Sequence, residues 1–260
     1  MLDQIQELVQ HEGISLVGVA PVDRFEGAPR GHHPKDFIPT TRSVVVFGIG
    51  LLPAAVAHGD LMCNSEVFSE PLRKKVGQDY LYTLSAYEIP NALLERVAMR
   101  SALMLQQAGY NTFYFPVTYG LLVRPIVKDM PDVFAPFSHR HAAVRAGLAE
   151  FGLNNIVVTP QFGPRVRFTS LVTEAELPPT PLLKEKVCLG STCSACVESC
   201  PDKAITISEG IDEDIFWLDP PSRTNKQICQ ESARTRFCRG ICQKVCPVHE
   251  GIWGEDSLSG

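Results

Sequence analysis

The residues with the most evident chemistry in this sequence are its cysteines. Eight of the nine lie between Cys188 and Cys246, in the stretches "VCLGSTCSACVESCPDKAI" (187–205) and "ICQESARTRFCRGICQKVCPVHEG" (228–251). Thiolates this close in sequence are typical ligands of metals and clusters, and a chain without a secretory signal does not use them as a disulfide framework. Cys63 has no cysteine or histidine at ligand spacing, so we interpret it as a packed apolar thiol.

The spacing within each stretch favours iron–sulfur clusters. Cys193-x2-Cys196-x3-Cys200-Pro is the last part of the bacterial ferredoxin run, and the second stretch ends in the similar Cys238-x3-Cys242-x3-Cys246-Pro. In two-cluster ferredoxins the cysteine before the proline ligates the other cluster. Applied here, the rule predicts two 4Fe–4S clusters, the first held by Cys188, Cys193, Cys196 and Cys246, and the second by Cys229, Cys238, Cys242 and Cys200.

Zinc and structural thiols are the alternatives. Two zinc sites with four cysteine ligands each would also use eight cysteines. Zinc ribbons pair CxxC knuckles, however, and rarely carry the x3-Cys-Pro ending twice. The first gap of one stretch and the 238–242 gap of the other are longer than usual in ferredoxins, and this is the main feature that keeps the zinc alternative open.

The residues ahead of the cysteines predict a mixed α/β (α+β) layer domain. Helical spacing of apolar residues predicts helices near the N-terminus, over 78–109 and over 139–152, with a kink or break at Pro90. Apolar and β-branched runs predict strands at 14–22, 43–51 and 110–117, and a hairpin over 154–177 with its turn at 159–164. The prolines of 177–181 indicate a linker between domains 1–180 and 181–260.

Composition excludes several classes of function. The 260 residues are 45% hydrophobic and 20% charged, with a net charge of −5, which is typical of a globular protein and gives no nucleic-acid footprint. The apolar runs are shorter than a membrane span, and the N-terminus has no basic and apolar signal region. We therefore expect a cytoplasmic protein that does not bind membranes.

Several pieces of the sequence, in their order and spacing, resemble one family. The pieces are "GHHPKDFIPTTRSVVVFGIG" (31–50), the "AGL" helix ending at Gly152, the "VTPQFGPRVR" turn (158–167), "LVTEAEL" (171–177), and then the paired cysteine stretches. Together they resemble the domain shared by epoxyqueuosine reductases and corrinoid reductive dehalogenases, over nearly the whole chain. The resemblance implies a nitroreductase-like domain that holds cobalamin, followed by a two-cluster ferredoxin-like module.

The resemblance also implies roles for individual residues. Electrons would pass through the two clusters to the corrinoid, which would reduce a small molecule or a modified base. The turn would contact the corrin, and Arg140 would face the substrate. Asp132 or Tyr119 would supply the proton, although a tyrosine in such a loop more often only packs. The residues expected to bind the cofactor are Thr159, Gly163, Pro164, Arg165 and Arg167.

The sequence departs from the family in two places. Epoxyqueuosine reductases carry an Asp-Ser-Gly/Ala-Pro segment, where this chain has "DVFAPFSHR" (132–140), with Val133 at the aligned position and Asp132 one residue earlier. The C-terminal repeat domain that helps to hold tRNA has no counterpart after Cys246, so we expect no nucleic-acid partner. The expected partners are a small-molecule substrate and a low-potential electron donor of the ferredoxin or flavodoxin type.

Other interpretations remain open for the front domain. It could bind FMN, as nitroreductase-like domains commonly do. It could also serve only to dock a corrinoid or flavin protein that receives electrons from the clusters. The turn at 158–167 could be a tight hairpin with a solvated basic edge. His139 and His141, which flank Arg140, are interpreted as a helix cap or a solvated face.

Overall fold

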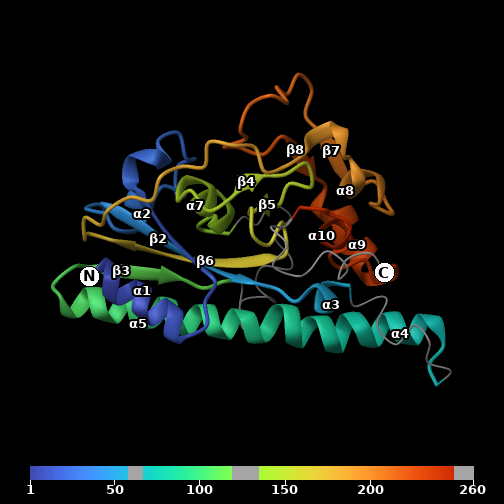
Figure 1. Ribbon diagram of the computed structural model, residues 1–260, viewed down its shortest axis with the longest axis horizontal. Coiled ribbons are helices and arrows are strands. Elements are labelled where there is room, and N and C mark those ends of the chain that lie inside the picture. The colour runs from blue at the N-terminus through green and yellow to red at the C-terminus, as the bar shows by residue number, and fades with distance from the viewer. Residues whose placement is uncertain (58–66, 119–134, 249–260) are drawn as a thin grey trace. The chain divides into compact units, whose positions relative to one another are not determined.

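The computed structural model describes residues 1–57, 67–118 and 135–248 and has a mixed α/β fold (Figure 1). The chain forms two compact units, each assembled from separate stretches. Unit 1 comprises 1–49, 91–148 and 167–182, and unit 2 comprises 50–90, 149–166 and 183–260. The linker expected at 177–181 thus lies next to a crossing between units. The grouping of 50–90 and 149–166 with the cysteine-rich stretch was not predicted from the sequence.

A four-stranded sheet forms the centre of unit 1. Its order is β1–β2–β6–β3, from β1 (Leu16–Pro21), β2 (Ser43–Gly50), β6 (Val166–Thr173) and β3 (Thr112–Phe115). The β1–β2 and β3–β6 pairs are antiparallel, with Val19 opposite Val45 and Phe115 opposite Ser170. All residues of β2 before Gly50 are buried, which explains why this strand is a continuous apolar run. The strands expected at 14–22, 43–51 and 110–117 are confirmed.

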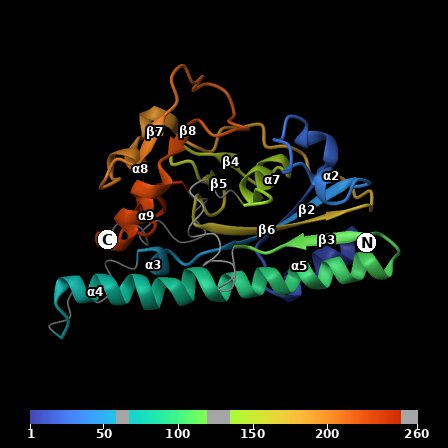
Figure 2. The ribbon, with the colours of Figure 1, turned by 180° about the vertical axis from the view of Figure 1, so that it is seen from behind.

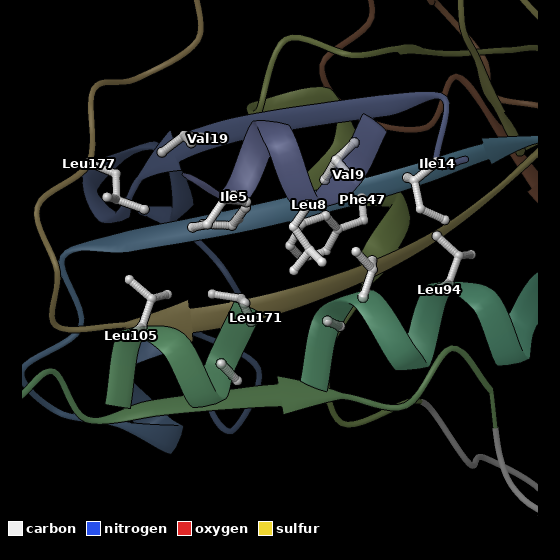
Figure 3. Close-up of a cluster of buried hydrophobic side chains, with 14 of the residues drawn as sticks. Ile5, Leu8, Val9, Ile14, Val19, Phe47, Leu94, Leu105, Leu171 and Leu177 are labelled. Carbon is white, nitrogen blue, oxygen red and sulfur yellow. The ribbon is translucent and has the colours of Figure 1, made fainter. Parts of the chain in front are cut away.

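Helices cover both faces of this sheet. Figure 1 shows α5 (Ile89–Gln107) along one face and α7 (His139–Arg145) on the other. The helix α1 (Leu2–His11) shares a core with α5 and the strands. In Figure 3, side chains of α1 and α5 meet side chains of β2 and β6, among them Leu8, Leu105, Phe47 and Leu171. The spacing of apolar residues that predicted α1 therefore marks the side of the helix that enters the core.

The helical pattern over 78–109 is also confirmed, and it begins earlier than expected. The helix α4 (Glu70–Val76), the π-helical segment η3 (Gly77–Glu88) and α5 follow one another without a gap in the sequence. Pro90 does not break this path. It is the second residue of α5, directly after the π-helical turns, and we attribute the change of hydrogen-bond register there to the missing N–H and the ring of this proline.

The expected helix over 139–152 and the hairpin that follows differ from the structure. The helix α7 ends at Arg145, and β4 (Glu150–Phe151) pairs with β5 (Val157–Val158). The predicted pairing of the strands on either side of the turn is therefore wrong, because β6 joins the sheet of unit 1. Pro160 and Pro164 have no N–H to continue a ladder, and an isolated bridge between Thr159 and Gly163 takes the place of one.

The remaining elements are short. In unit 1 they are η1 (Val22–Phe25) and α2 (Pro34–Phe37). In unit 2 they are α3 (Pro53–Val56), η4 (Gly190–Thr192), α8 (Ala195–Glu198), β7 (Ile205–Ile207), β8 (Ser222–Thr224), α9 (Lys226–Thr235) and α10 (Ile241–Lys244). Figure 2 shows α8 beside β7 and β8, which pair antiparallel. None of the helices in the described ranges has the length and apolar character that a membrane span needs.

Candidate functional site

The two cysteine stretches fold into closely similar backbone motifs within unit 2. Each motif has a four-residue helix, α8 or α10, whose N-cap residue is in the left-handed region, Ser194 at φ 50° and Gly240 at φ 90°. Cys196 and Cys242 are the second residues of these helices. The longer 238–242 gap is taken up before the helix, where Arg239 separates Cys238 from Gly240. The unusual spacing therefore leaves the rest of the motif unchanged.

The structure gathers four thiols from both stretches around one cavity. Cys188, Cys193 and Cys196 of the first stretch line it together with Cys246 of the second, and the remaining lining is mostly apolar. Electrostatics reflects the same grouping. Burial raises the pKa of Cys196 to about 12, and the neighbouring Cys188, Cys246 and Cys193 add to this effect. The membership of this group equals the first expected ligand set.

The other four cysteines form a second group. Burial raises the pKa of Cys242 to about 12, with further contributions from Cys229 and Cys238 and from Cys196 of the first group. Burial also raises the pKa of Cys238, and Cys200 and Cys229 raise it further. Cys200 of the first stretch thus acts on thiols of the second. Cys229, Cys238 and Cys242 all have raised pKa values, and such neighbouring thiols become thiolates together only when a cation compensates their charge, which is the environment of a metal or cluster site.

Backbone N–H groups point at several of these sulfurs. The N–H groups of Gly190 and Leu153 donate to Cys188, where they oppose the effect of burial on its pKa. The N–H of Ala204 donates to the sulfur of Cys200 at 3.2 Å. Hydrogen bonds of this kind favour the thiolate form and tune the potential of iron–sulfur clusters.

Glu150 is a functional residue that the sequence analysis missed. Its buried carboxylate accepts hydrogen bonds from the backbone N–H groups of Val187 (2.6 Å), Cys188 (2.9 Å) and Trp217 (2.8 Å). Lys186 lies 3.7 Å from the same carboxylate and 3.6 Å from the centre of the Trp217 ring. Glu150 therefore fixes the backbone at Cys188. The only signal in the sequence is a carboxylate within the apolar run 146–153.

Arg165 has a different role from the one expected from the sequence. Its side chain is fully buried, and it donates to the carbonyls of Gln243 (2.7 Å), Cys246 (3.0 Å) and Val248 (3.0 Å). These bonds fix the backbone on both sides of Cys246. Because both Nη atoms are used inside the protein, the guanidinium is not presented to a corrin ring.

The rest of the turn supports the same segment. Gly163 has φ +56°, and a Cβ there would lie 2.1 Å from the carbonyl oxygen of Val248. The close approach that Gly163 permits is therefore to the backbone of Val248 in the same protein. Pro164 accepts a hydrogen bond from Gln243 at 3.1 Å, and the buried hydroxyl of Thr159 closes the turn through Phe162 and Gly163. One interpretation of this turn was a hairpin with a solvated basic edge. At Arg165 the basic side chain is instead buried inside the protein.

Arg167 and Arg140 belong to unit 1. The Nε of Arg167 donates to Asn91 Oδ1 at 2.5 Å. Arg140 is the second residue of α7, and the protein around it lowers the pKa of its guanidinium through desolvation, although part of the side chain reaches solvent. It stays a cation at neutral pH. Its expected role toward a substrate stays a prediction.

The two histidines beside Arg140 are hydrogen-bonded. His141 Nδ1 lies 2.7 Å from the hydroxyl of Ser138, the N-cap of α7. His139 Nδ1 lies 3.0 Å from Ser170 Oγ, and its Nε2 lies 3.0 Å from the carbonyl oxygen of Pro116. Burial lowers the pKa of His139 to about 4. His139 is therefore neutral at pH 7, with Nε2 as the donor to Pro116.

Three residues of the sequence predictions, Cys63, Tyr119 and Asp132, lie outside the described residues. Among the described residues, no group of three or more His, Cys, Asp or Glu side chains is arranged to hold a single metal ion. The ligand roles of the eight cysteines stay predictions.

Comparison with known proteins points to two kinds of enzyme. The tetrachloroethene reductive dehalogenase of Sulfurospirillum multivorans is 34% identical over 124 residues, which cover 45% of this chain and 25% of that protein. The epoxyqueuosine reductase of Bacillus anthracis is 28% identical over 133 residues, which cover 48% of this chain and 33% of that protein. The chain resembles both. No protein-family model matches the sequence.

Solved structures of the same two kinds share the fold. The epoxyqueuosine reductase of Streptococcus thermophilus matches with a TM-score of 0.55 and 17% identity over 98% of this chain and 67% of that chain. An epoxyqueuosine reductase with a tRNA stem loop matches with a TM-score of 0.58 and 17% identity over 96% and 65%. A reductive dehalogenase studied for B12-dependent dehalogenation matches with a TM-score of 0.52 and 16% identity over 98% of this chain and 32% of that chain. The resemblance expected from the sequence is confirmed.

Proposed function

We propose that this chain is an oxidoreductase in which two iron–sulfur clusters deliver electrons to a corrinoid that reduces a small molecule or a modified base. The curated relatives are reductases, but the matched regions cover only 25% and 33% of the first two, so their activities come to this chain as a proposal. The cytoplasm is the proposed location. The observation that supports the proposal is the cavity that Cys188, Cys193 and Cys196 of the first stretch line together with Cys246 of the second.

The donor sets suit clusters. Cys188, Cys193, Cys196 and Cys246 would hold one cluster, and Cys200, Cys229, Cys238 and Cys242 the other. Bound clusters of this kind supply one-electron transfer at low potential. Two such groups in one unit favour transfer in single steps from a donor protein to an acceptor.

The protein around the thiols has two tasks. The mostly apolar lining of the cavity at Cys246 lowers the local dielectric around the thiolates, which strengthens the effect of each N–H donor. Glu150 and Arg165 hold the backbone at Cys188 and Cys246, which are two of the four proposed ligands of the first group. Rigid positions reduce the reorganisation that accompanies electron transfer.

A corrinoid rests on weaker support. One structural neighbour is a B12-dependent dehalogenase, yet Arg165, Gly163 and Pro164 make their contacts within the protein and do not fit the expected corrin contacts. We therefore derive no step through this group. If a corrinoid binds, its contacts come from other residues, and Arg140 remains the proposed group on the substrate side.

The internal use of the 158–167 turn also favours a second candidate function. In that case the chain only passes electrons to a separate corrinoid or flavin protein and has no substrate of its own. This candidate needs no free donors in the turn. FMN in place of the corrinoid would be a third arrangement. The expectation that no nucleic acid binds stays a prediction, since one structural neighbour holds a tRNA stem loop.

Metal and cofactor analysis of the anaerobically purified chain tests the proposal. We expect about eight iron and eight sulfide per chain, the content of two cubes. Stoichiometric zinc without iron would contradict it. Titration with hydroxocobalamin under reduction then separates the two candidate functions. Saturable binding supports the reductase, whereas no binding at high micromolar cobalamin, where a site worth about −7 kcal/mol would be well filled, supports the electron-transfer partner.

A further inference from the structure

A buried ion pair lies next to Cys188 in unit 2. The Glu150 carboxylate is fully buried, and its oxygen Oε2 accepts hydrogen bonds from the backbone N–H groups of Val187 and Cys188. The other oxygen, Oε1, lies 3.7 Å from Lys186 Nζ and accepts a hydrogen bond from the N–H of Trp217 at 2.8 Å. One side of the carboxylate thus faces the first group of cysteines, and the other side faces the ammonium group of Lys186.

Lys186 is held in place by contacts beyond the ion pair. Its Nζ donates to the carbonyl of Ile215 at 2.8 Å and lies 3.6 Å from the centre of the Trp217 ring. That ring is fixed in turn, because Trp217 is buried and its Nε1 donates to the carbonyl of Asp212 at 2.8 Å. Only 24% of the Lys186 side chain is exposed, so solvent and salt screen its charge less than that of an exposed lysine.

The charges of this pair act on the first group of cysteines. Burial is the largest effect that raises the pKa of the Cys188 thiol, and among the charged side chains Glu150 raises this pKa further and Lys186 lowers it. A negative charge that opposes a thiolate also opposes the arrival of an electron, because each adds negative charge at the same place. Glu150 therefore makes reduction of the first site harder, and Lys186 offsets that effect.

Two other charged side chains lie in the same part of unit 2. Arg165 donates to the carbonyl of Cys246. Glu213, whose carboxylate Lys186 also influences, accepts hydrogen bonds from the N–H and the hydroxyl of Ser191. Substitution of Lys186 leaves the hydrogen bonds of both residues in place, so a change at the first site can be attributed to the loss of the Lys186 charge.

We propose that Lys186 is a charge-compensating residue, whose ammonium group keeps the first site reducible by offsetting the buried charge of Glu150. An ionised carboxylate can accept all three N–H groups, whereas an amide has one acceptor oxygen, so the contact that holds the backbone brings a charge with it. Reduction adds one electron from the donor to the site, and no bond is made or broken. The inference rests on the proposed function, because it requires a cluster at Cys188, Cys193, Cys196 and Cys246.

A redox titration of the anaerobically purified chain, followed by EPR, tests the proposal. Lys186→Gln removes the cation but keeps a donor for the carbonyl of Ile215. At a fixed potential we expect the ratio of reduced to oxidised first cluster to fall about tenfold, which is a shift of about 59 mV for a one-electron couple. Glu150→Gln should shift the ratio in the opposite direction. Lys186→Arg keeps the charge and should stay close to the wild-type ratio.

Lys184→Gln is the matched control, because it removes the same charge from an exposed residue two positions away. The second cluster is an internal control, and its ratio should change much less in every variant. Equal shifts in Lys184→Gln and Lys186→Gln would overturn the proposal, and so would a Lys186→Arg shift as large as that of Lys186→Gln. A shift of Glu150→Gln in the same direction as Lys186→Gln would indicate a merely structural role and overturn it too.

Iron content is measured on every variant. If Lys186→Gln loses iron, Lys186→Met carries the same test, because its side chain can still pack on Trp217. If Glu150→Gln loses iron, the comparison of Lys186→Gln with Lys186→Arg decides alone. A wild-type chain without iron would contradict the proposed function and this inference together, whereas full iron with an unchanged potential in Lys186→Gln would overturn this inference alone.

Discussion

The Glu150 carboxylate is the single side chain whose loss should disturb the first cysteine group most directly. It is fully buried and accepts hydrogen bonds from three backbone N–H groups. In Glu150→Gln the amide NH₂ must face at least one of those donors, which leaves a buried N–H without an acceptor. We expect a loss of about 1–3 kcal/mol, seen as a lower midpoint in anaerobic urea unfolding.

The matched control for this prediction is Glu176→Gln. Glu176 pairs with Arg42 at the surface, and its side chain is 78% exposed, so the same chemical change should cost at most about 0.5 kcal/mol. Equal midpoints for the two variants would contradict the bracing role of Glu150.

His139 should make the stability of the chain depend on pH. Its pKa is lowered to about 4 in the folded chain, against about 6.5 in an unfolded one. The unfolded chain therefore binds a proton first, and the stabilisation is complete above about pH 6.5 and is lost as pH falls toward 4. Replacing His139 with Phe should make the unfolding midpoint depend less on pH between about pH 7 and about pH 5.

His11→Gln is the control, because the side chain of His11 is 82% exposed. It should keep the wild-type dependence on pH. If His139→Phe keeps that dependence too, His139 does not have the lowered pKa described here.

Cysteine ligands can be recognised in a sequence because their chemistry is local. The Cys-Pro ending of the second stretch was enough to predict that Cys246 lies with Cys188, Cys193 and Cys196 around one cavity, whereas the ligand sets themselves stay predictions. The partners of Arg165 could not be predicted, because Gln243, Cys246 and Val248 lie 78, 81 and 83 residues further along the chain. The role of Glu150 could not be predicted for the same reason, since its partners lie 37 to 67 positions away in the sequence.

At the scale of elements, the turn that holds the Cys246 segment offers a sharp test. Gly163→Ala places a Cβ 2.1 Å from the carbonyl oxygen of Val248 and strains a backbone at φ +56°. The segment after Cys246 must then shift, so we expect iron to be lost from the cluster of the first group, with Mössbauer spectra of the second cluster unchanged.

Gly109→Ala separates backbone strain from this displacement. Gly109 has φ +91°, but a Cβ there has no neighbour within 4 Å. It should lose about 1–2 kcal/mol of stability and keep all iron. A Gly163→Ala chain with full iron content would show that the turn does not support the cluster site.

Elements were predictable where local pattern decides them. The β-branched run of β2 and the helical spacing of α1 are the same in sequence and structure. The hairpin after Gly152 was not predictable, because Val157 and Val158 read as one arm of a hairpin with β6 but pair with β4. Two partner strands compete for Val157 and Val158, and the short strand β4 on one side wins because β6 on the other side joins the sheet of unit 1.

At the scale of the whole molecule, the division into two units changes how the chain should be dissected. Unit 2 contains 50–90 and 149–166 together with the cysteine-rich stretch. Glu150 and Arg165, which hydrogen-bond to the backbone at Cys188 and Cys246, belong to 149–166. Cutting the chain at residue 180 would separate Glu150 and Arg165 from Cys188 and Cys246, whose backbone they hold. The chain also matches only parts of its curated relatives, so its substrate has to be sought experimentally.

The central claim is that each cluster takes ligands from both stretches, and iron content of two double variants tests it most directly. In Cys193→Ala/Cys246→Ala both substitutions fall in one proposed set, so one cube of about four iron should remain. In Cys238→Ala/Cys246→Ala they fall in different sets, so no intact cube should remain in Mössbauer spectra. If each stretch instead binds its own cluster, the results are reversed: the first variant keeps no intact cube, and the second keeps one.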